Sequence, residues 1–155
     1  MSHDVPAPGS FELGTDGPSA ILVGVDDTVT ATRAAWYAAG LARRQRARLI
    51  AVFVAPPGGT ASIGGAPVIV AEAEAHEQMA ASMRARAEDV GRELGISVEF
   101  VTAHGDPYSE IKRIADETRA DAIVVGASAK AGHRLVGSLA VRLVRAGKWP
   151  VTVVP

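Results

Sequence analysis

The sequence predicts an α/β fold, namely a single doubly wound parallel sheet of five strands, in the order 3-2-1-4-5, with helices on both faces. Three observations support this prediction. Short apolar runs alternate with helical patterns along the chain, as in successive β-α units. Hydrophobic residues make up 48% of the chain but aromatic residues only 5%, so the core must be aliphatic. The length of 155 residues fits one such domain.

Five segments are typical of strands, and their polarity predicts the order of the sheet. The first, second and fourth are almost continuously apolar, which indicates burial on both faces and a central place. The third and fifth contain polar residues and belong at the edges. An order of 3-2-1-4-5 satisfies both conditions, and it puts the topological switch between strands one and four. The segments are Ala20–Val25, Arg48–Val54, Ile96–Phe100, Ala122–Val125 and Val151–Val154.

Four helical segments connect these strands. The first follows Asp27 or Thr28, either of which can cap it, and runs to about Arg46. The glycine- and proline-containing stretch 55–69 is predicted as a loop, and a helix follows over about 70–94, with Met79 and Met83 at core spacing. A third helix begins at the Gly105-Asp-Pro107 step, and a fourth spans about 137–146.

The composition limits the kinds of partner that the protein is expected to bind and the compartment in which it is expected. Residues 1–18 are predicted to be a flexible N-terminal tail and residues 19–155 the folded domain. A net charge of −1 with scattered basic residues argues against nucleic acid as a partner. The chain has no cysteine, no secretion-signal pattern and no apolar run of membrane-spanning length. We therefore expect a cytoplasmic protein without a membrane partner or a metal centre.

A ligand site is expected where the strands flanking the switch end, at Asp26 and Gly126, because ligands in such sheets bind beside the carboxyl ends of these strands. From Gly126 the chain continues through the small-residue stretch Ala-Ser128-Ala to Gly137-Ser138, which opens a helix. Small residues and a helix N-terminus suit a phosphate, and Lys130, His133 and Arg134 add positive charge.

A structural interpretation of the same residues stays open. Gly126 and Gly137 can be turn residues, and Ser138 can be a helix N-cap. Asp26 and Asp27 can be capping residues, or they can contact a ligand or Mg²⁺. Because adjacent residues of an extended strand point to opposite faces, the two carboxylates are not expected to converge.

Motifs of common enzymes are absent. The loop is not a Walker A motif, no Gly-x-Gly-x-x-Gly follows the first strand, and no Gly-x-Ser-x-Gly occurs. The sequence therefore predicts no dedicated catalytic activity and at most slow ATP turnover.

Several of these segments together resemble the universal stress protein family over residues 19–155. They are the first strand with its terminal Asp26, Gly105-Asp-Pro107, the strand ending at Gly126, Gly137-Ser138, and the closing stretch from Trp149 to Pro155. The resemblance implies the strand order 3-2-1-4-5 and a homodimer formed through the last strand, Val151–Val154. It also implies a cleft for ATP or another adenine nucleotide, with Mg²⁺ as the accompanying ion.

Site residues follow from the resemblance. Asp26 would contact the nucleoside, backbone around Val52 to Val54 would border the adenine, and a Gly-x2-Gly-x9-Gly-Ser/Thr loop would hold the phosphates. Here Ala129 takes the place of the middle glycine, and the interval from Gly126 to Gly137 is two residues shorter. The candidate set is Asp26, Asp27, Val52, Val54, Gly126, Ser128, Gly132, His133, Gly137 and Ser138.

Three functions are consistent with these features. One is a stress-response or signalling module that binds a nucleotide and acts on an unidentified signalling partner. A second is a nucleotide-independent dimeric scaffold of the same family. A third, an ATP pyrophosphatase, is disfavoured because it needs a Ser-Gly-Gly loop where this chain has Asp26-Asp27-Thr28.

Overall fold

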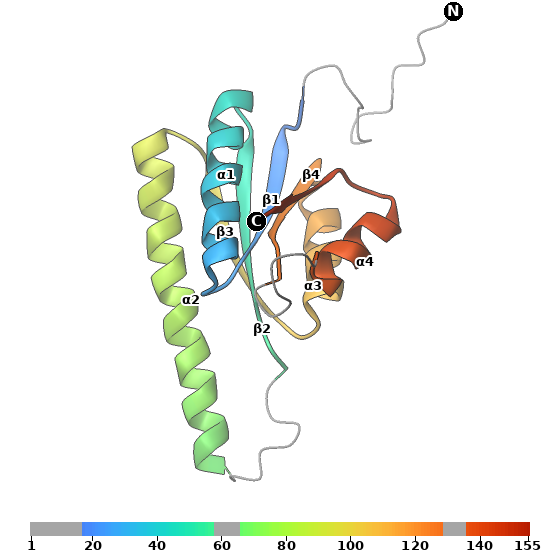
Figure 1. Ribbon diagram of the computed structural model, residues 1–155. Helices are drawn as coiled ribbons and strands as arrows, with labels where there is room; N and C mark the ends of the chain where they lie inside the picture. The colour runs from blue at the N-terminus through green and yellow to red at the C-terminus, as the bar shows by residue number, and fades with distance from the viewer. Residues whose placement is uncertain (1–16, 58–65, 129–135) are drawn as a thin grey trace, which may run out of the picture.

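The computed structural model describes residues 17–57, 66–128 and 136–155, so most of the predicted N-terminal tail lies outside the described residues. The described residues form a parallel sheet in the order β3-β2-β1-β4-β5, which confirms the predicted fold and strand order (Figure 1). The strands are β1 Ala20–Val25, β2 Arg48–Ala55, β3 Val98–His104, β4 Ala122–Gly126 and β5 Val151–Val154. The helices are α1 Val29–Gln45, α2 Ala66–Leu94, α3 Pro107–Glu117 and α4 Ser138–Ala146.

Two predicted boundaries were wrong. The third strand was expected over 96–100 but spans Val98–His104, because it pairs with β2 as far as Ala55↔His104. The N–H of Ile96 instead donates to the Gly91 carbonyl and belongs to the turn that ends α2. The loop expected over 55–69 is shorter, since α2 begins at Ala66.

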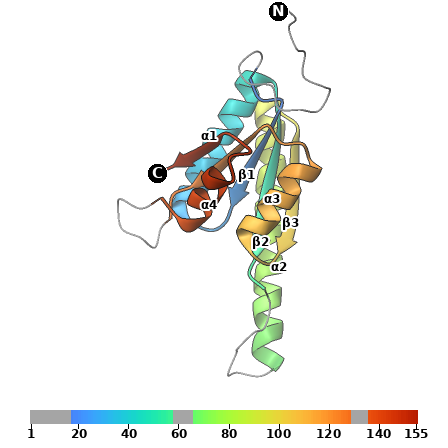
Figure 2. The same ribbon diagram turned by 90° about the vertical axis from the view of Figure 1, so that its right-hand side faces the viewer.

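The helices cover the sheet in two layers (Figures 1 and 2). α1 and α2 lie on one face, and α3 and α4 lie on the other. Successive side chains of a strand point to opposite faces of the sheet, so β1 contributes to both cores. Ile21 packs on the α1 side and Leu22 on the α3–α4 side. Both side chains are fully buried, as the unbroken apolar run predicted.

The local sequence explains where α1 and α3 begin. Thr28 is the N-cap of α1, and its hydroxyl accepts a hydrogen bond from the Ala31 N–H at 3.2 Å. Asp106 is the N-cap of α3, and Pro107 occupies the first turn, where its missing N–H costs nothing. Of the two predicted caps for α1, Thr28 rather than Asp27 holds the position.

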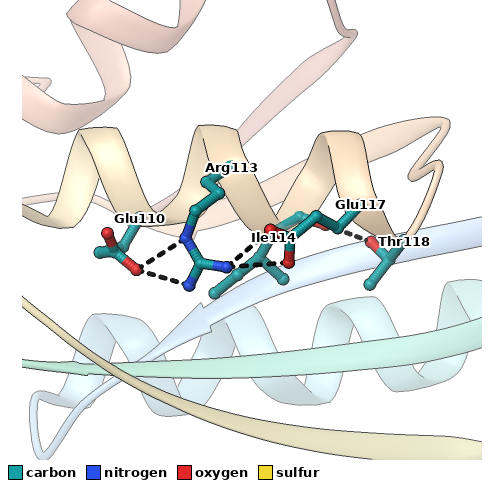
Figure 3. A network of polar contacts seen from close by, with 5 residues as sticks. All are labelled: Glu110, Arg113, Ile114, Glu117 and Thr118. Atoms are coloured by element: carbon teal, nitrogen blue, oxygen red, sulfur yellow. Dashed lines mark hydrogen bonds and ion pairs between the residues drawn. The ribbon is translucent and has the colours of Figure 1, made fainter.

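The outer surface of α3 carries a small charged network (Figure 3). The Arg113 guanidinium contacts Glu110 at 2.6 Å and Glu117 at 2.8 Å, and these carboxylates raise the Arg113 pKa above its usual range. One turn on, the Thr118 hydroxyl donates to the Ile114 carbonyl. Exposed pairs at this spacing stabilise a helix only weakly, so the network gives α3 a small local support.

Strand β5 forms one edge of the sheet, and Trp149 precedes it. Its side chain packs beneath the sheet, where Trp149 joins the core on the α3–α4 side. Within the described part of the chain, no helix combines the length and apolar character needed to cross a membrane.

Candidate functional site

The carboxyl ends of β1 and β4 lie side by side, as the position of the topological switch predicted. The two strands pair directly, with Val23 opposite Val124. Beyond them the Thr30 hydroxyl of α1 donates to the Ala127 carbonyl at 2.7 Å. This bond ties the first turn of α1 to the chain that leaves β4.

A cavity of about 290 Å³ opens at this point, and we call it the switch-point cavity. Its volume is at the lower end of the range of about 300–1,000 Å³ that is usual for small-molecule sites. It is lined by the ends of β1, β2 and β4 and by the starts of α1, α3 and α4. The lining residues are Gly24, Val25, Asp26, Thr28, Ala31, Val52, Val54, Pro107, Val125, Gly126, Ala127, Ser128, Gly137, Ser138, Leu139 and Ala140.

Asp26 is the one carboxylate among these lining residues. One of its oxygens, Oδ1, accepts a hydrogen bond from the Thr28 N–H at 2.8 Å, so Asp26 also shapes the turn into α1. The side chain is exposed, which leaves its other oxygen open to a ligand. Both interpretations of Asp26, turn former and ligand contact, are therefore compatible with its position.

Asp27 does not line the switch-point cavity. It lines a groove on the opposite face of the sheet, between α1 and α2. Asp26 lines both the groove and the switch-point cavity, whereas Asp27 lines the groove alone. This difference agrees with the expectation that the two adjacent carboxylates do not converge. Assigning Asp27 to the nucleotide cleft is not supported by its location.

Gly126 is required by packing within the protein. A Cβ at this position would lie 2.6 Å from the Ala31 nitrogen and 2.6 Å from the Thr30 carbonyl carbon. Real side chains do not approach backbone this closely, so only glycine lets β4 end against α1. Gly126 is therefore required for the contact between β4 and α1, whether or not it also leaves space for a ligand.

The N-terminus of α4 faces the same cavity. Gly137 is the N-cap residue and Ser138 the first helical residue, so the interpretation of Ser138 as the N-cap was wrong. The helix is capped by no side-chain hydrogen bond, and its first N–H groups have no partner within the helix. Gly137 also packs closely on Ser128, since a Cβ there would lie 2.8 Å from the Ser128 Cβ.

The apolar part of the cavity comes from several elements. Val52 and Val54 of β2 line it, as predicted, and Val52 is buried. Pro107 and Leu139, at the starts of α3 and α4, were missed. The sequence did not reveal these two residues, because only the packed structure shows how far α3 and α4 reach over the sheet face that carries Val52. Gly132 and His133 lie outside the described residues.

At the protein surface, an ion pair joins the N-cap of α3 to α4. The Arg142 guanidinium contacts Asp106 at 3.0 Å and lies 4.1 Å from the ring centre of Tyr108. Hydrogen bonds from the Ser109 hydroxyl, from Arg142 and from the Ser109 N–H lower the Asp106 pKa to about 2. The two helices that form one wall of the cavity are thereby linked at their surface.

This pKa predicts an acid-dependent contribution to stability. The folded-state pKa lies below the unfolded value of about 3.9, so the ionised carboxylate stabilises the fold above about pH 4. That contribution is lost as the pH falls from about 4 to about 2. We expect the melting temperature of Asp106→Asn to lie below that of the wild type near pH 6, and the gap to shrink near pH 2. A gap that stays constant in a thermal-denaturation series would contradict the assignment.

Comparison with known proteins agrees with the fold. The model of the Universal stress protein family matches residues 19–155. The chain belongs to the universal stress protein family. This agrees with the resemblance noted from the strand ends and glycine positions. A universal stress protein of Methanocaldococcus jannaschii is 27% identical over 139 residues, which cover 86% of this chain and 80% of the relative.

Solved structures of the family share the architecture. A universal stress protein from Lactobacillus plantarum is 28% identical, with a TM-score of 0.73 over 88% of this chain and 97% of that one. One from Archaeoglobus fulgidus in complex with dAMP is 25% identical, with a TM-score of 0.62 over 88% and 97%. A universal stress protein in complex with cAMP is 25% identical, with a TM-score of 0.67 over 89% and 97%.

Proposed function

We propose that this universal stress protein is a homodimeric stress-response or signalling module that binds an adenine nucleotide in the switch-point cavity. The observation that carries the proposal is the meeting of three features in one cavity: the Asp26 carboxylate, an apolar wall and the start of α4. The relatives solved with cAMP and dAMP support it, because both ligands are adenine nucleotides.

Each feature suits one part of such a ligand. The apolar wall of Val52, Val54 and Leu139 suits the base, and the Asp26 carboxylate suits the ribose hydroxyls as an acceptor. The free N–H groups at the start of α4 and the nearby Ser128 and Ser138 hydroxyls suit a phosphate. A volume of about 290 Å³ suits a nucleoside with little more than its first phosphate.

Further phosphates of ATP would extend from the start of α4, and Mg²⁺ would be held mainly by these phosphates. Among the described residues no group of three His, Cys, Asp or Glu side chains could hold a metal ion by itself. We continue to expect at most slow ATP turnover. The cytoplasmic location and an unidentified signalling partner belong to the same proposal.

Calorimetric titration tests the nucleotide site with a matched pair of variants. We expect saturable heat with AMP, cAMP or ATP with Mg²⁺, and a roughly ten- to hundredfold weaker affinity for Asp26→Ala, because a charged acceptor of the ribose is lost. Asp27→Ala removes a neighbouring carboxylate that does not line the cavity, so its affinity should stay within about twofold of the wild type. Gly137→Val, which puts a side chain against Ser128, should abolish binding.

An absence of heat with all three nucleotides would reject the nucleotide site. Equal losses in Asp26→Ala and Asp27→Ala would point to a general charge effect instead. In the first case the nucleotide-independent dimeric scaffold would become the better account of this chain, and in the second the position of Asp26 in the site would be rejected.

The dimer is proposed to form through the outer edge of β5, which pairs with no other strand among the described residues. The Pro150 and Val154 carbonyls accept hydrogen bonds from β4, so the alternating pattern of a parallel strand turns the peptide groups of Val151 and Val153 toward the open edge. Unpaired edge groups invite a second strand, and a twofold-related copy is the natural partner.

Replacing Val153 with proline removes one outward N–H and should convert a dimer into a monomer, as measured by light scattering at tens of micromolar. Val153→Ala is the matched control, because it also shortens the side chain but keeps the N–H. It should remain dimeric. A wild-type mass of one chain would contradict the dimer, and a monomeric Val153→Ala would move its cause to side-chain packing.

A further inference from the structure

A second cavity lies on the other face of the sheet, between α1 and α2, and we call it the α1–α2 groove. Its volume is about 600 Å³, within the usual range for sites that hold drug-sized molecules. Its floor is formed by residues of β1, β2 and β3 and its walls by residues of α1 and α2. Figure 1 shows these two helices on the same face of the sheet. We propose that this groove binds a small organic molecule with an apolar body and a cationic group, and that the cation lies beside Asp27.

The groove exists because the facing sides of the two helices carry small side chains. Larger residues at these positions would fill the space above the sheet, as they do in most helix–sheet interfaces. The small residues on the two walls are Ala31, Ala35, Ala39, Ala75, Ser82 and Ala87. These small side chains leave room for the hollow once the two helices are packed on the sheet.

The body of the groove suits an apolar ligand. Phe100 lies on the floor, and Met79 and Met83 line the α2 wall, where their flexible thioether side chains can adapt to different shapes. Trp36 lines the α1 wall and is 47% exposed, which is unusual for so large an aromatic side chain. A ligand in the groove would cover this indole and bury apolar surface on three sides.

The charges lie at different places along the groove. Asp26 and Asp27 stand at the end where β1 finishes, and no basic side chain of the described residues forms an ion pair with either of them. On α2, Met79 packs in the same cluster as Val25 at this end, whereas Arg86 lies seven residues, or about 10 Å, further along the helix. Two carboxylates at one end therefore favour a cation there, held beside an apolar body.

The groove also borders the switch-point cavity. Val25, Asp26 and Ala31 line both spaces, so a molecule in either would lie against the same turn at the end of β1. The groove proposal does not rest on the nucleotide site, because Asp27, Trp36 and all the α2 residues line the groove alone. Asp27 and Trp36 can therefore be used to test it separately.

The test uses decyltrimethylammonium bromide below its micelle concentration, titrated into the full chain and followed by tryptophan fluorescence and calorimetry. Decanol and sodium decyl sulfate are the uncharged and anionic probes of equal chain length. We expect saturable binding of one cationic probe per chain, with a fluorescence change that Trp36→Phe abolishes while Trp149 remains. Asp27→Asn should weaken the affinity for the cationic probe about two- to fivefold, as for a surface charge pair, and leave the affinity for decanol unchanged.

A matched pair on α2 tests the location. Ser82→Leu places a larger side chain into the groove and should weaken all three probes at least roughly tenfold. Ala81→Leu adds a larger apolar side chain at an exposed neighbour that does not line the groove and should change nothing. Because leucine is a good helix former, both variants should melt close to the wild type, which a thermal scan checks.

Several outcomes would overturn the proposal. They are an absence of saturable binding, equal effects of Ser82→Leu and Ala81→Leu, and sodium decyl sulfate binding as tightly as the cationic probe. A change of mass in Ser82→Leu by light scattering would assign the groove to a second copy of the chain instead. Loss of nucleotide binding in Asp26→Ala, with the probes still binding, would leave the groove proposal intact.

Discussion

Replacing Gly126 with alanine should lower the free energy of unfolding by about 2–3 kcal/mol, although only one methyl group is added. The new Cβ would lie 2.6 Å from the Ala31 nitrogen and 2.8 Å from the Thr30 carbonyl oxygen. These are backbone atoms of α1, so no change of rotamer can relieve the overlap. Either α1 or the end of β4 must shift, and the bond from the Thr30 hydroxyl to the Ala127 carbonyl would be strained. Urea denaturation measures the loss.

Gly40→Ala is the matched control within α1. Its Cβ would lie 3.4 Å from the end of the flexible Arg44 side chain, which can move away. Alanine in a helix interior is favoured over glycine by roughly 0.5–1 kcal/mol, so this variant should be slightly more stable than the wild type. If Gly126→Ala lost no more than about 0.5 kcal/mol, the close approach of β4 to α1 would be disproved.

Leu143→Ala should cost about 2–5 kcal/mol, the range for truncation of a fully buried leucine. Leu143 is 0% exposed, and together with Ala140 it forms the buried side of α4. It is the larger of the two, so it supplies most of the apolar surface that holds α4 to the sheet. The start of α4 lines the switch-point cavity, so nucleotide affinity should fall together with stability.

Val144→Ala is the control for this prediction. Val144 is the next residue of α4 but is 57% exposed, so its truncation should stay within about 0.5 kcal/mol of the wild type. Chemical denaturation of both variants, followed by calorimetric titration of the folded fraction, separates the two effects. A Leu143→Ala protein that is as stable as Val144→Ala would contradict the role given to Leu143 in anchoring α4.

The candidate site could be predicted in its principal parts. The carboxyl ends of β1 and β4 follow from strand order, which in turn follows from the polarity of each strand, and this placed Asp26 and the end of β4 together. Val52 and Val54 came from the family resemblance, and both line the cavity. Pro107 and Leu139 could not be foreseen, because their distance from β2 depends on how α3 and α4 pack on the sheet.

The sequence by itself determined the five-stranded sheet, its order and the division of each strand between two cores, because the burial of a strand is encoded in its own residues with a period of two. Only the tertiary structure shows the remaining features. Pairing with β2 sets the length of β3, and the close contact with α1 requires glycine at position 126. The turn into α1 sets which cavity Asp27 lines. The α1–α2 groove is likewise a feature that only the tertiary structure shows. Hollows and close approaches arise from the combined volumes of side chains on separate elements, and that sum exists only once those elements are packed together.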